Sequence, residues 1–288
     1  MESTTRKIVL YTGGALILIW TIVPVYWLIN MSLTHQKEIL DARLVPKNPT
    51  ICNYARLLDD DAKCNSLDNK PYQAIGQAPQ IRRGLMNSLI VAGIVTGATL
   101  LIAIPVAYAL GRLEFKRKTA LLITIVTSRA YPPIAILIPF FALYQKWGLI
   151  GERKGLVIVY LTITVPLVAW ILTGFFASLP RNLEALARTD GCTRGQAIYR
   201  VFIPAAIPGI SASAVIAFLA CWNEFTFAFM LTPGTEAQPF PPTLASMFFQ
   251  ISYPGENAAA AMLALIPVVI LAYLFQSRIR SLNIVNPL

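Results

Sequence analysis

The sequence predicts an all-α membrane protein with about six transmembrane helices. Of its 288 residues, 56% are hydrophobic and only 13% are charged, which is more apolar surface than a water-soluble domain of this length can cover. Several apolar runs are long enough to cross a bilayer core of about 30 Å. The Lys and Arg residues lie mainly between these runs, as in a multi-pass membrane protein.

The apolar runs give the expected spans in chain order. They cover residues 8–30, 85–110, 119–144, 156–176, 205–231 and 257–275. The third is the weakest, because Arg129, Pro132 and Pro133 interrupt it, either as a bend or as the end of a helix. We therefore divide the chain into a first transmembrane helix (1–32), an extracytoplasmic loop (33–83), a core with five further spans (84–280) and a cytoplasmic tail (281–288). The first run has no convincing cleavage site and is expected to be a retained span.

The positions of the cations predict the orientation. With both termini inside, the short inner segments hold twelve Lys and Arg residues against four acids. Cytoplasmic loops carry such an excess of Lys and Arg. The net charge of +10 is thus explained without a nucleic-acid partner, which would require basic residues on one soluble face.

The long outer loop contains Cys52 and Cys64, which form a small disulfide if the outer compartment is oxidising. Two unpaired thiols are the alternative. His35 is the only histidine and no CxxC spacing occurs, so we expect no metal site and no catalytic site.

Residues 177–208 form the most informative segment. Gly191 is suited to end a first short helix in the left-handed conformation. Thr193 and Gln196 form a T-x-x-Q capping box that begins a second. Leu183, Leu186 and Ala187 share a predicted face of the first helix, and an apolar stripe on the second is formed by Ala197, Ile198, Val201 and Phe202. Two short helices with four arginines fit either the cleft of a soluble partner or an anionic membrane surface.

This segment carries a resemblance to a known family. The run from Glu184 to Gly191 (EALARTDG), followed by Ile203 and Pro204, resembles the EAA coupling loop of ABC importer permeases. Other segments resemble carbohydrate-uptake permeases of the maltose-transporter type: residues 24–27 (PVYW), 87–90 (NSLI), 107–116 (AYALGRLEFK) and 222–225 (WNEF). The similarity covers nearly the whole chain and is closest to the smaller permease of the pair.

The resemblance implies a type I ABC importer permease fold with cytoplasmic coupling helices, in the plasma (inner) membrane of a bacterium or archaeon. It implies three protein partners besides membrane lipid: a second homologous permease, a cytoplasmic ATPase dimer that uses ATP and Mg, and an extracytoplasmic substrate-binding protein. The residues it assigns to ATPase coupling are Glu184, Ala187, Asp190, Gly191, Arg194 and Pro204. Ala185 stands where the family usually has a second Glu, which leaves open whether Glu184 contacts the ATPase from one position earlier.

The chain has no phosphate-binding loop of its own, since residues 111–119 have the wrong spacing. We therefore expect a permease that binds no cofactor and is not an enzyme. It would serve the import of a sugar or sugar-like solute, such as a disaccharide, an oligosaccharide or a glycosyl polyol. An ion-gradient-driven transporter or channel is the alternative, but it predicts ionisable relays and an internal repeat, and neither is evident.

Polar residues inside apolar runs are candidates for the solute pathway. Trp222, Asn223 and Glu224 combine a ring face with hydrogen-bonding groups, which suits a polyhydroxylated ligand. The alternative is that Asn223 and Glu224 tie helices together or cap a break in the span. Arg129, followed by Tyr131, either lines the pathway as well, pairs with Glu224 or lies near a membrane interface.

Overall fold

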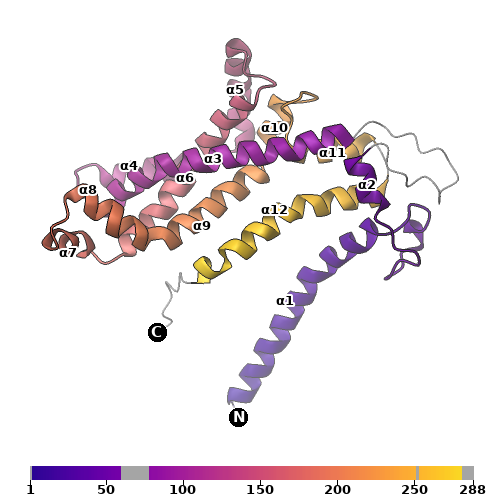
Figure 1. The fold of residues 1–288 in the computed structure, drawn as a ribbon, viewed down its shortest axis with the longest axis horizontal. Coiled ribbons are helices and arrows are strands. Elements are labelled where there is room, and N and C mark those ends of the chain that lie inside the picture. The colour runs from indigo at the N-terminus through magenta and orange to yellow at the C-terminus, as the bar shows by residue number, and fades with distance from the viewer. Residues whose placement is uncertain (1, 60–77, 251–252, 281–288) are drawn as a thin grey trace. The chain divides into compact units, whose positions relative to one another are not determined.

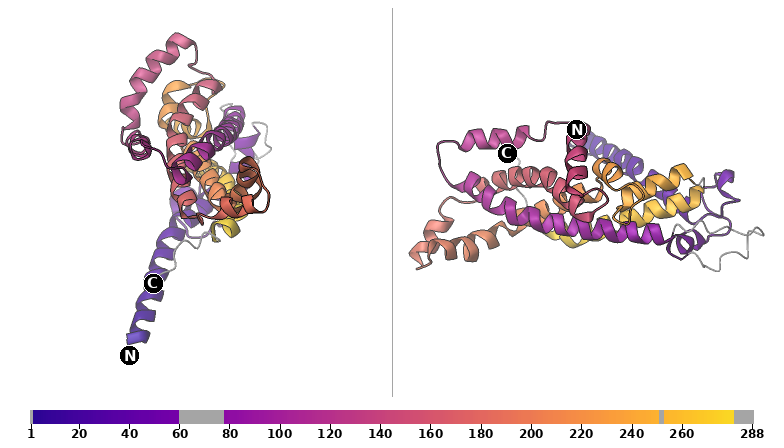
Figure 2. Two further views of the ribbon diagram at one scale, coloured as in Figure 1. Left: turned by 90° about the vertical axis from the view of Figure 1, so that its left-hand side faces the viewer. Right: turned by 90° about the horizontal axis from the view of Figure 1, so that it is seen from above.

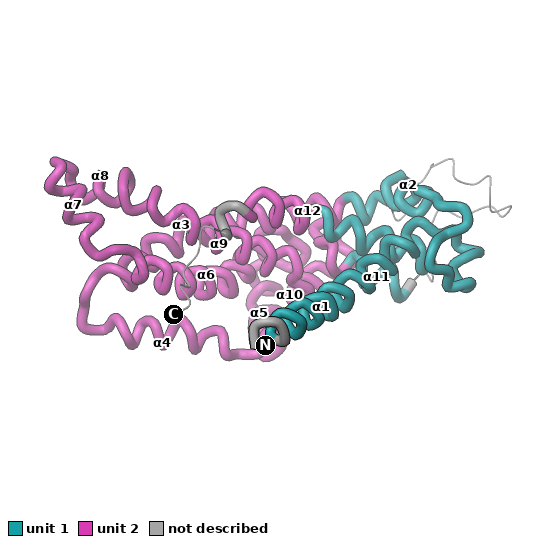
Figure 3. Tube along the Cα trace, turned by 90° about the horizontal axis from the view of Figure 1, so that it is seen from below, with its two compact units in different colours: residues 1–82, 243–266 teal, residues 83–242, 267–288 magenta. Residues whose placement is uncertain are grey.

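The computed structural model describes residues 2–59, 78–250 and 253–280, and these form helices and turns without a strand. The chain divides into two compact units, shown in Figure 3. One comprises residues 1–82 and 243–266, and the other comprises residues 83–242 and 267–288. The predicted tail 281–288 and Cys64 lie outside the described residues.

The first unit begins with the long helix α1 (Glu2–Ser32), followed by η1 (Ile39–Asp41) and α2 (Cys52–Leu58). The segment after α1 is held by buried amides. Asn53 Nδ2 donates to the carbonyl oxygens of Ser32 at 2.9 Å and Thr34 at 3.0 Å. Arg56 of α2 forms a buried ion pair at 3.6 Å with Glu256 of α12 (Pro254–Arg280). Parts of α3 (Ala78–Arg112), α11 (Phe240–Gln250) and α12 complete this unit.

The second unit contains the rest of α3 and the helices that follow it. They are α4 (Lys118–Thr127), α5 (Pro133–Trp147), α6 (Arg153–Ser178), α7 (Leu183–Thr189), α8 (Arg194–Ala197), η2 (Ile198–Phe202), α9 (Ile203–Trp222) and α10 (Thr226–Leu231). α6 packs along α9 and also contacts α4. Figures 1 and 2 show α7 and α8 at one end of this unit, while α5 and α10 lie toward the other.

Small residues allow α3, α6 and α9 to approach closely. Buried alanines come from all three helices: Ala103, Ala107, Ala169, Ala206 and Ala217. At Gly209 of α9, an added Cβ atom would come within 2.2 Å of the Phe175 ring on α6. Helices in a bilayer associate by such close van der Waals packing and by interhelical hydrogen bonds. Thr99 and Thr164 supply one of these bonds between α3 and α6, at 2.6 Å.

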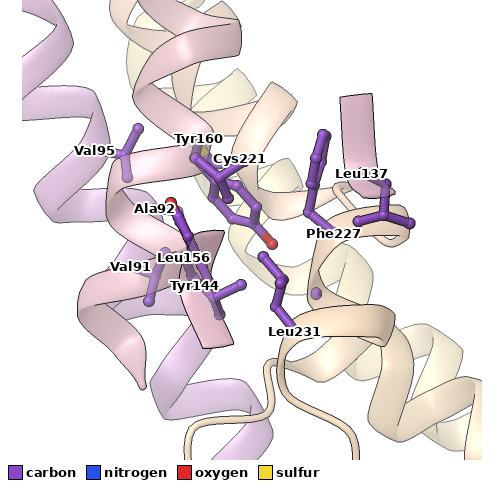
Figure 4. Packing of buried hydrophobic residues seen from close by; sticks show 12 residues of the cluster. Val91, Ala92, Val95, Leu137, Tyr144, Leu156, Tyr160, Cys221, Phe227 and Leu231 are labelled. Atoms are coloured by element: carbon purple, nitrogen blue, oxygen red, sulfur yellow. The ribbon is translucent and has the colours of Figure 1, made fainter. Parts of the chain in front are cut away.

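A second apolar cluster joins α5 and α10 to α3 and α6 (Figure 4). Tyr144, Tyr160 and Phe227 are among its large buried side chains. The hydroxyl of Tyr144 donates to the carbonyl oxygen of Gly155 at 3.0 Å. This contact fastens the end of α5 to the beginning of α6, so the turn between them is fixed from within.

The structure refines the predicted spans. Among the described residues, five helices are long and apolar enough to cross a membrane: Arg6–Ser32, Ala78–Arg112, Arg153–Ser178, Arg194–Trp222 and Pro254–Gln276. The run predicted as the third span is two helices, because α4 ends at Thr127 and α5 begins at Pro133. Proline lacks the N–H that a continuous helix needs and is well suited to a first turn. The run predicted to end at 231 breaks after Trp222.

Candidate functional site

Two parts of the second unit contain most of the predicted site residues. The first, which we call the knob, comprises residues 179–202 and includes α7, α8 and η2. The second, which we call the break, comprises residues 223–225 between α9 and α10. α9 leads from one to the other along the chain.

The fold of the knob follows from its predicted caps. Gly191 has φ of +87°, and its N–H donates to the carbonyl of Arg188 while that of Cys192 reaches the carbonyl of Ala187, each at 3.1 Å. This pair of bonds is a Schellman motif. Thr193 Oγ1 accepts from the Gln196 N–H at 3.4 Å, and Gln196 Oε1 accepts from the Thr193 N–H at 2.9 Å. Both the left-handed glycine and the capping box are therefore confirmed.

The inward side of the knob packs on the ends of α3 and α6. Ala187 and Ala197 are buried, and the Phe202 ring meets the edges of Tyr108 and Phe176 with centroids 5.1 Å apart in both cases. The predicted face of the first helix is partly wrong, because Leu186 is 54% exposed while Ala187 is buried. Tyr199 is also exposed, so two large side chains of the knob are left uncovered by the part of the chain that the structure describes.

The charged residues of the knob fall into two groups. Asp190 and the four arginines Arg181, Arg188, Arg194 and Arg200 are exposed, as is Pro204 just beyond the knob. Glu184, in contrast, forms an ion pair with Arg112 at 3.1 Å between Oε1 and Nε. Arg112 was not among the predicted site residues. The only signal for it was its place in the 107–116 segment that resembles the family.

The break is organised by the Glu224 carboxylate. One oxygen accepts from the Phe227 N–H at 2.9 Å, and the other accepts from the Ala228 N–H at 3.2 Å. An acidic side chain in this position satisfies the first free amides of a helix and complements its dipole. This geometry matches the alternative that Glu224 caps a break, and its contact with solute stays a prediction.

The neighbours of Glu224 differ in exposure. Trp222 is buried and stacks on Phe218, with ring centroids 5.8 Å apart. Asn223 is exposed in the isolated chain. Its amide is therefore the polar group of the break that is open to a ligand or to another subunit.

The remaining predicted pathway residues lie in the connection between α4 and α5. Arg129 donates from Nη1 to the carbonyl oxygen of Ile163 on α6 at 2.9 Å. The alternative of an Arg129–Glu224 ion pair is not formed between these two described residues, whose groups bind main-chain atoms instead. Tyr131 is 63% exposed. A pathway role for either residue stays a prediction.

The structure describes three of the four cysteines. Cys52 is disulfide-bonded, but its predicted partner Cys64 lies outside the described residues, so the pairing stays a prediction. Cys192 and Cys221 are free thiols. Within the described residues, no three His, Cys, Asp or Glu side chains gather into a group that could hold a metal ion.

Comparison with known proteins identifies the family. Residues 83–281 match the family of binding-protein-dependent transport system inner membrane components. This match covers more than half of the chain, which therefore belongs to that family. The chain is accordingly a multi-pass membrane protein and a transport permease.

Individual relatives are similar to this chain over almost its whole length. The chain is 31% identical over 283 residues to the trehalose/maltose transport system permease protein MalG of Thermococcus litoralis, covering 97% of this chain and 96% of the relative. It is also 31% identical to the trehalose transport system permease protein SugB of Mycobacterium tuberculosis, covering 90% and 89%. The fold matches a chain in the crystal structure of a bacterial ABC transporter involved in the import of the acidic polysaccharide alginate, with a TM-score of 0.72, 20% identity and coverage of 96% and 97%.

Proposed function

We propose that this chain forms one half of the translocation pathway of an ATP-driven, binding-protein-dependent importer for a sugar or sugar-like solute. The observation that carries the proposal is the family match over residues 83–281, within which the knob presents two capped helices at one end of a helical unit. The solute class rests on relatives named for trehalose and maltose transport, which are similar along nearly the full chain. A disaccharide, an oligosaccharide or a glycosyl polyol would fit this class.

The energy would come from a separate cytoplasmic ATPase dimer that binds ATP and Mg. The proposed coupling residues are Glu184, Ala187, Asp190, Gly191, Arg194 and Pro204, which lie in or beside the knob. The exposed Tyr199 and the exposed arginines support docking into a protein cleft, because Tyr and Arg are enriched among the residues that dominate interface energies; burying the exposed Leu186 would add apolar contact area. ATP-driven closure of the dimer would move the knob and shift the permease between two arrangements.

The pathway itself would run past the break and would be completed by a second, homologous permease. We include Trp222, Asn223, Glu224, Arg129 and Tyr131 in it. Asn223 is the best placed for direct solute contact, because it is exposed, whereas the Glu224 carboxylate accepts hydrogen bonds from the main-chain amides at the start of α10. Non-helical backbone within a membrane is tolerated where it is buried in protein or lines a water-filled cavity, which is consistent with a pathway beside the break.

The excess of cations in the short segments next to α1, α3 and the knob favours a cytoplasmic position for both termini. The knob would then face the ATPase. A substrate-binding protein would deliver the solute on the opposite side and provide most of the selectivity.

The test is transport by the reconstituted complex. The chain, its partner permease, the ATPase and the binding protein would be placed in liposomes, and uptake of labelled trehalose, maltose and longer oligosaccharides would be measured with ATP inside. We expect uptake that requires both ATP and the binding protein. Uptake that continues without the ATPase and follows a proton or sodium gradient would contradict the proposal and favour a secondary transporter.

A further inference from the structure

Arg112 makes several contacts where α3 meets the knob. It ends α3, and only 4% of its side chain is exposed. Its Nε donates to Glu184 Oε1 at 3.1 Å, its Nη1 to the Leu179 carbonyl at 2.9 Å and its Nη2 to the Pro180 carbonyl at 2.8 Å. The same guanidinium lies 5.3 Å from the centre of the Phe202 ring. One side chain thus meets the end of α6, α7 and η2.

The chemistry of these contacts depends on the shape of a guanidinium. Its planar fork offers five N–H donors, and three separate nitrogens are used here. Leu179 and Pro180 follow directly after α6, at the helix end that carries partial negative charge. The Pro180 carbonyl also accepts from the Leu183 N–H at 3.4 Å, so Arg112 is its second donor. A lysine has a single nitrogen on a flexible stem and cannot reproduce this arrangement.

The Glu184 carboxylate is therefore engaged by Arg112 of the same chain. Its side chain is 23% exposed, and a hydrogen bond between two charged groups is about twice as strong as a neutral one. The exposed side chains of the knob include Leu186 and Tyr199 and a set of charged groups that is mostly cationic.

We propose that Arg112 and Glu184 form an internal brace that makes the knob and α3 move as one body. In this role, which rests on the proposed function, Glu184 is a positioning residue for coupling and does not contact the ATPase. Contact with the ATPase falls to the exposed residues, including Leu186 and Arg188. The partner cleft should accordingly combine an apolar pocket with acidic side chains.

Limited proteolysis of the purified full-length chain tests the brace without the ATPase. Arg188 and Arg194 lie within the short helices α7 and α8, so trypsin cleaves there when the knob opens locally and the cleavage rate follows the open population. We expect Glu184→Gln and Arg112→Lys to be cleaved in the knob about tenfold faster than the unmodified chain.

Glu114→Gln is the matched control, because Glu114 pairs with Lys118 at 3.4 Å but is 79% exposed. It should leave the cleavage rate unchanged, as exposed pairs contribute little. Cleavage of Glu184→Gln at the rate of the unmodified chain would overturn the brace.

Reconstituted transport then tests the positioning role. Glu184→Gln should still purify with the ATPase, while the number of solute molecules moved per ATP falls by about tenfold. The double variant Arg112→Lys with Glu184→Gln should be no worse than the more severe single variant, because both remove the same interaction. Loss of the ATPase from Glu184→Gln with normal proteolysis, or additive effects in the double variant, would contradict the proposal. If the unmodified complex shows no ATP-driven uptake, the proposed function fails, and the proteolysis still decides whether the brace exists.

Discussion

The knob and the break each depend on one glutamate, but the partners of the two carboxylates come from different places. Glu184 is bound by Arg112, which lies 72 residues earlier in the chain. Glu224 is bound by main-chain amides only three and four residues later. The knob therefore depends on how α3 and α6 are packed, whereas the main-chain hydrogen bonds of Glu224 lie within its own segment. Tyr160 of α6 also lies beside the Glu224 carboxylate, so the break too has a neighbour that is distant in sequence. Changes in the knob should act at a distance, and changes at the break should act mostly on α10.

The largest expected effect is that of Gly191→Pro, which disrupts the turn between α7 and α8 within the knob. Proline requires φ near −65°, whereas Gly191 has φ of +87°, and it removes the N–H that binds Arg188. We expect a local destabilisation of about 3 kcal/mol, with membrane insertion intact and ATPase assembly or coupling lost. Co-purification of the ATPase would measure assembly, and the number of solute molecules taken up per ATP hydrolysed would measure coupling.

Gly195→Ala is the control for that variant. It lies in α8, in helical backbone with open space around its Cβ position, so the knob should tolerate it. Normal coupled transport by Gly191→Pro would show that the knob is not the coupling element.

An intermediate effect is expected for Glu224→Ala, which removes the cap of α10. Losing two carboxylate–amide bonds at a helix start costs about 1–2 kcal/mol. The midpoint temperature of thermal unfolding of the purified chain should fall, while the rate of tryptic cleavage in the knob should not change. Glu236→Ala is a suitable control, since Glu236 is 89% exposed and pairs with the half-exposed Arg83. An equal loss of stability in both variants would argue against the capping role.

The smallest effect on stability is expected for Asn223→Ala. Because Asn223 is exposed, the free energy of unfolding should change by no more than about 0.5 kcal/mol. Uptake at low solute concentration should nevertheless fall by about tenfold, since a lost hydrogen bond to solute costs about 1–1.5 kcal/mol. Measuring uptake of two sugars separates the possibilities: a selective loss indicates solute contact, and normal uptake of both would remove Asn223 from the pathway.

The same contrast explains what the sequence could predict. Gly191 and the pair Thr193 and Gln196 act on their own segment, so their caps were predictable from local pattern. Pro132 and Pro133 marked the interruption in the third run, although not that it ends a helix. The position of Glu224 just before a helix start was also a usable signal for a cap.

The contacts of Arg112 were not predictable in this way. No local pattern specifies which carbonyls a side chain will meet after α3 and α6 have packed together. The exposure of Leu186 was missed for a related reason. In a seven-residue helix, the buried face is chosen by neighbours distant in sequence and only weakly by the spacing of its own apolar residues.

The continuity of α8, η2 and α9 has a mechanical consequence. Residues 194–222 form one uninterrupted helical stretch of 29 residues, or about 40 Å at 1.5 Å per residue. The stretch contains a π-helical turn at Ile198–Phe202 and the prolines Pro204 and Pro208, where helices can bend, but no non-helical residue separates the arginine-rich end from Trp222. If the stretch pivots by about 10° at the knob, its far end sweeps about 7 Å, which exceeds the spacing of one helical turn. A small rotation imposed on four-residue α8 is thus geometrically amplified into a movement on the scale of a sugar ring.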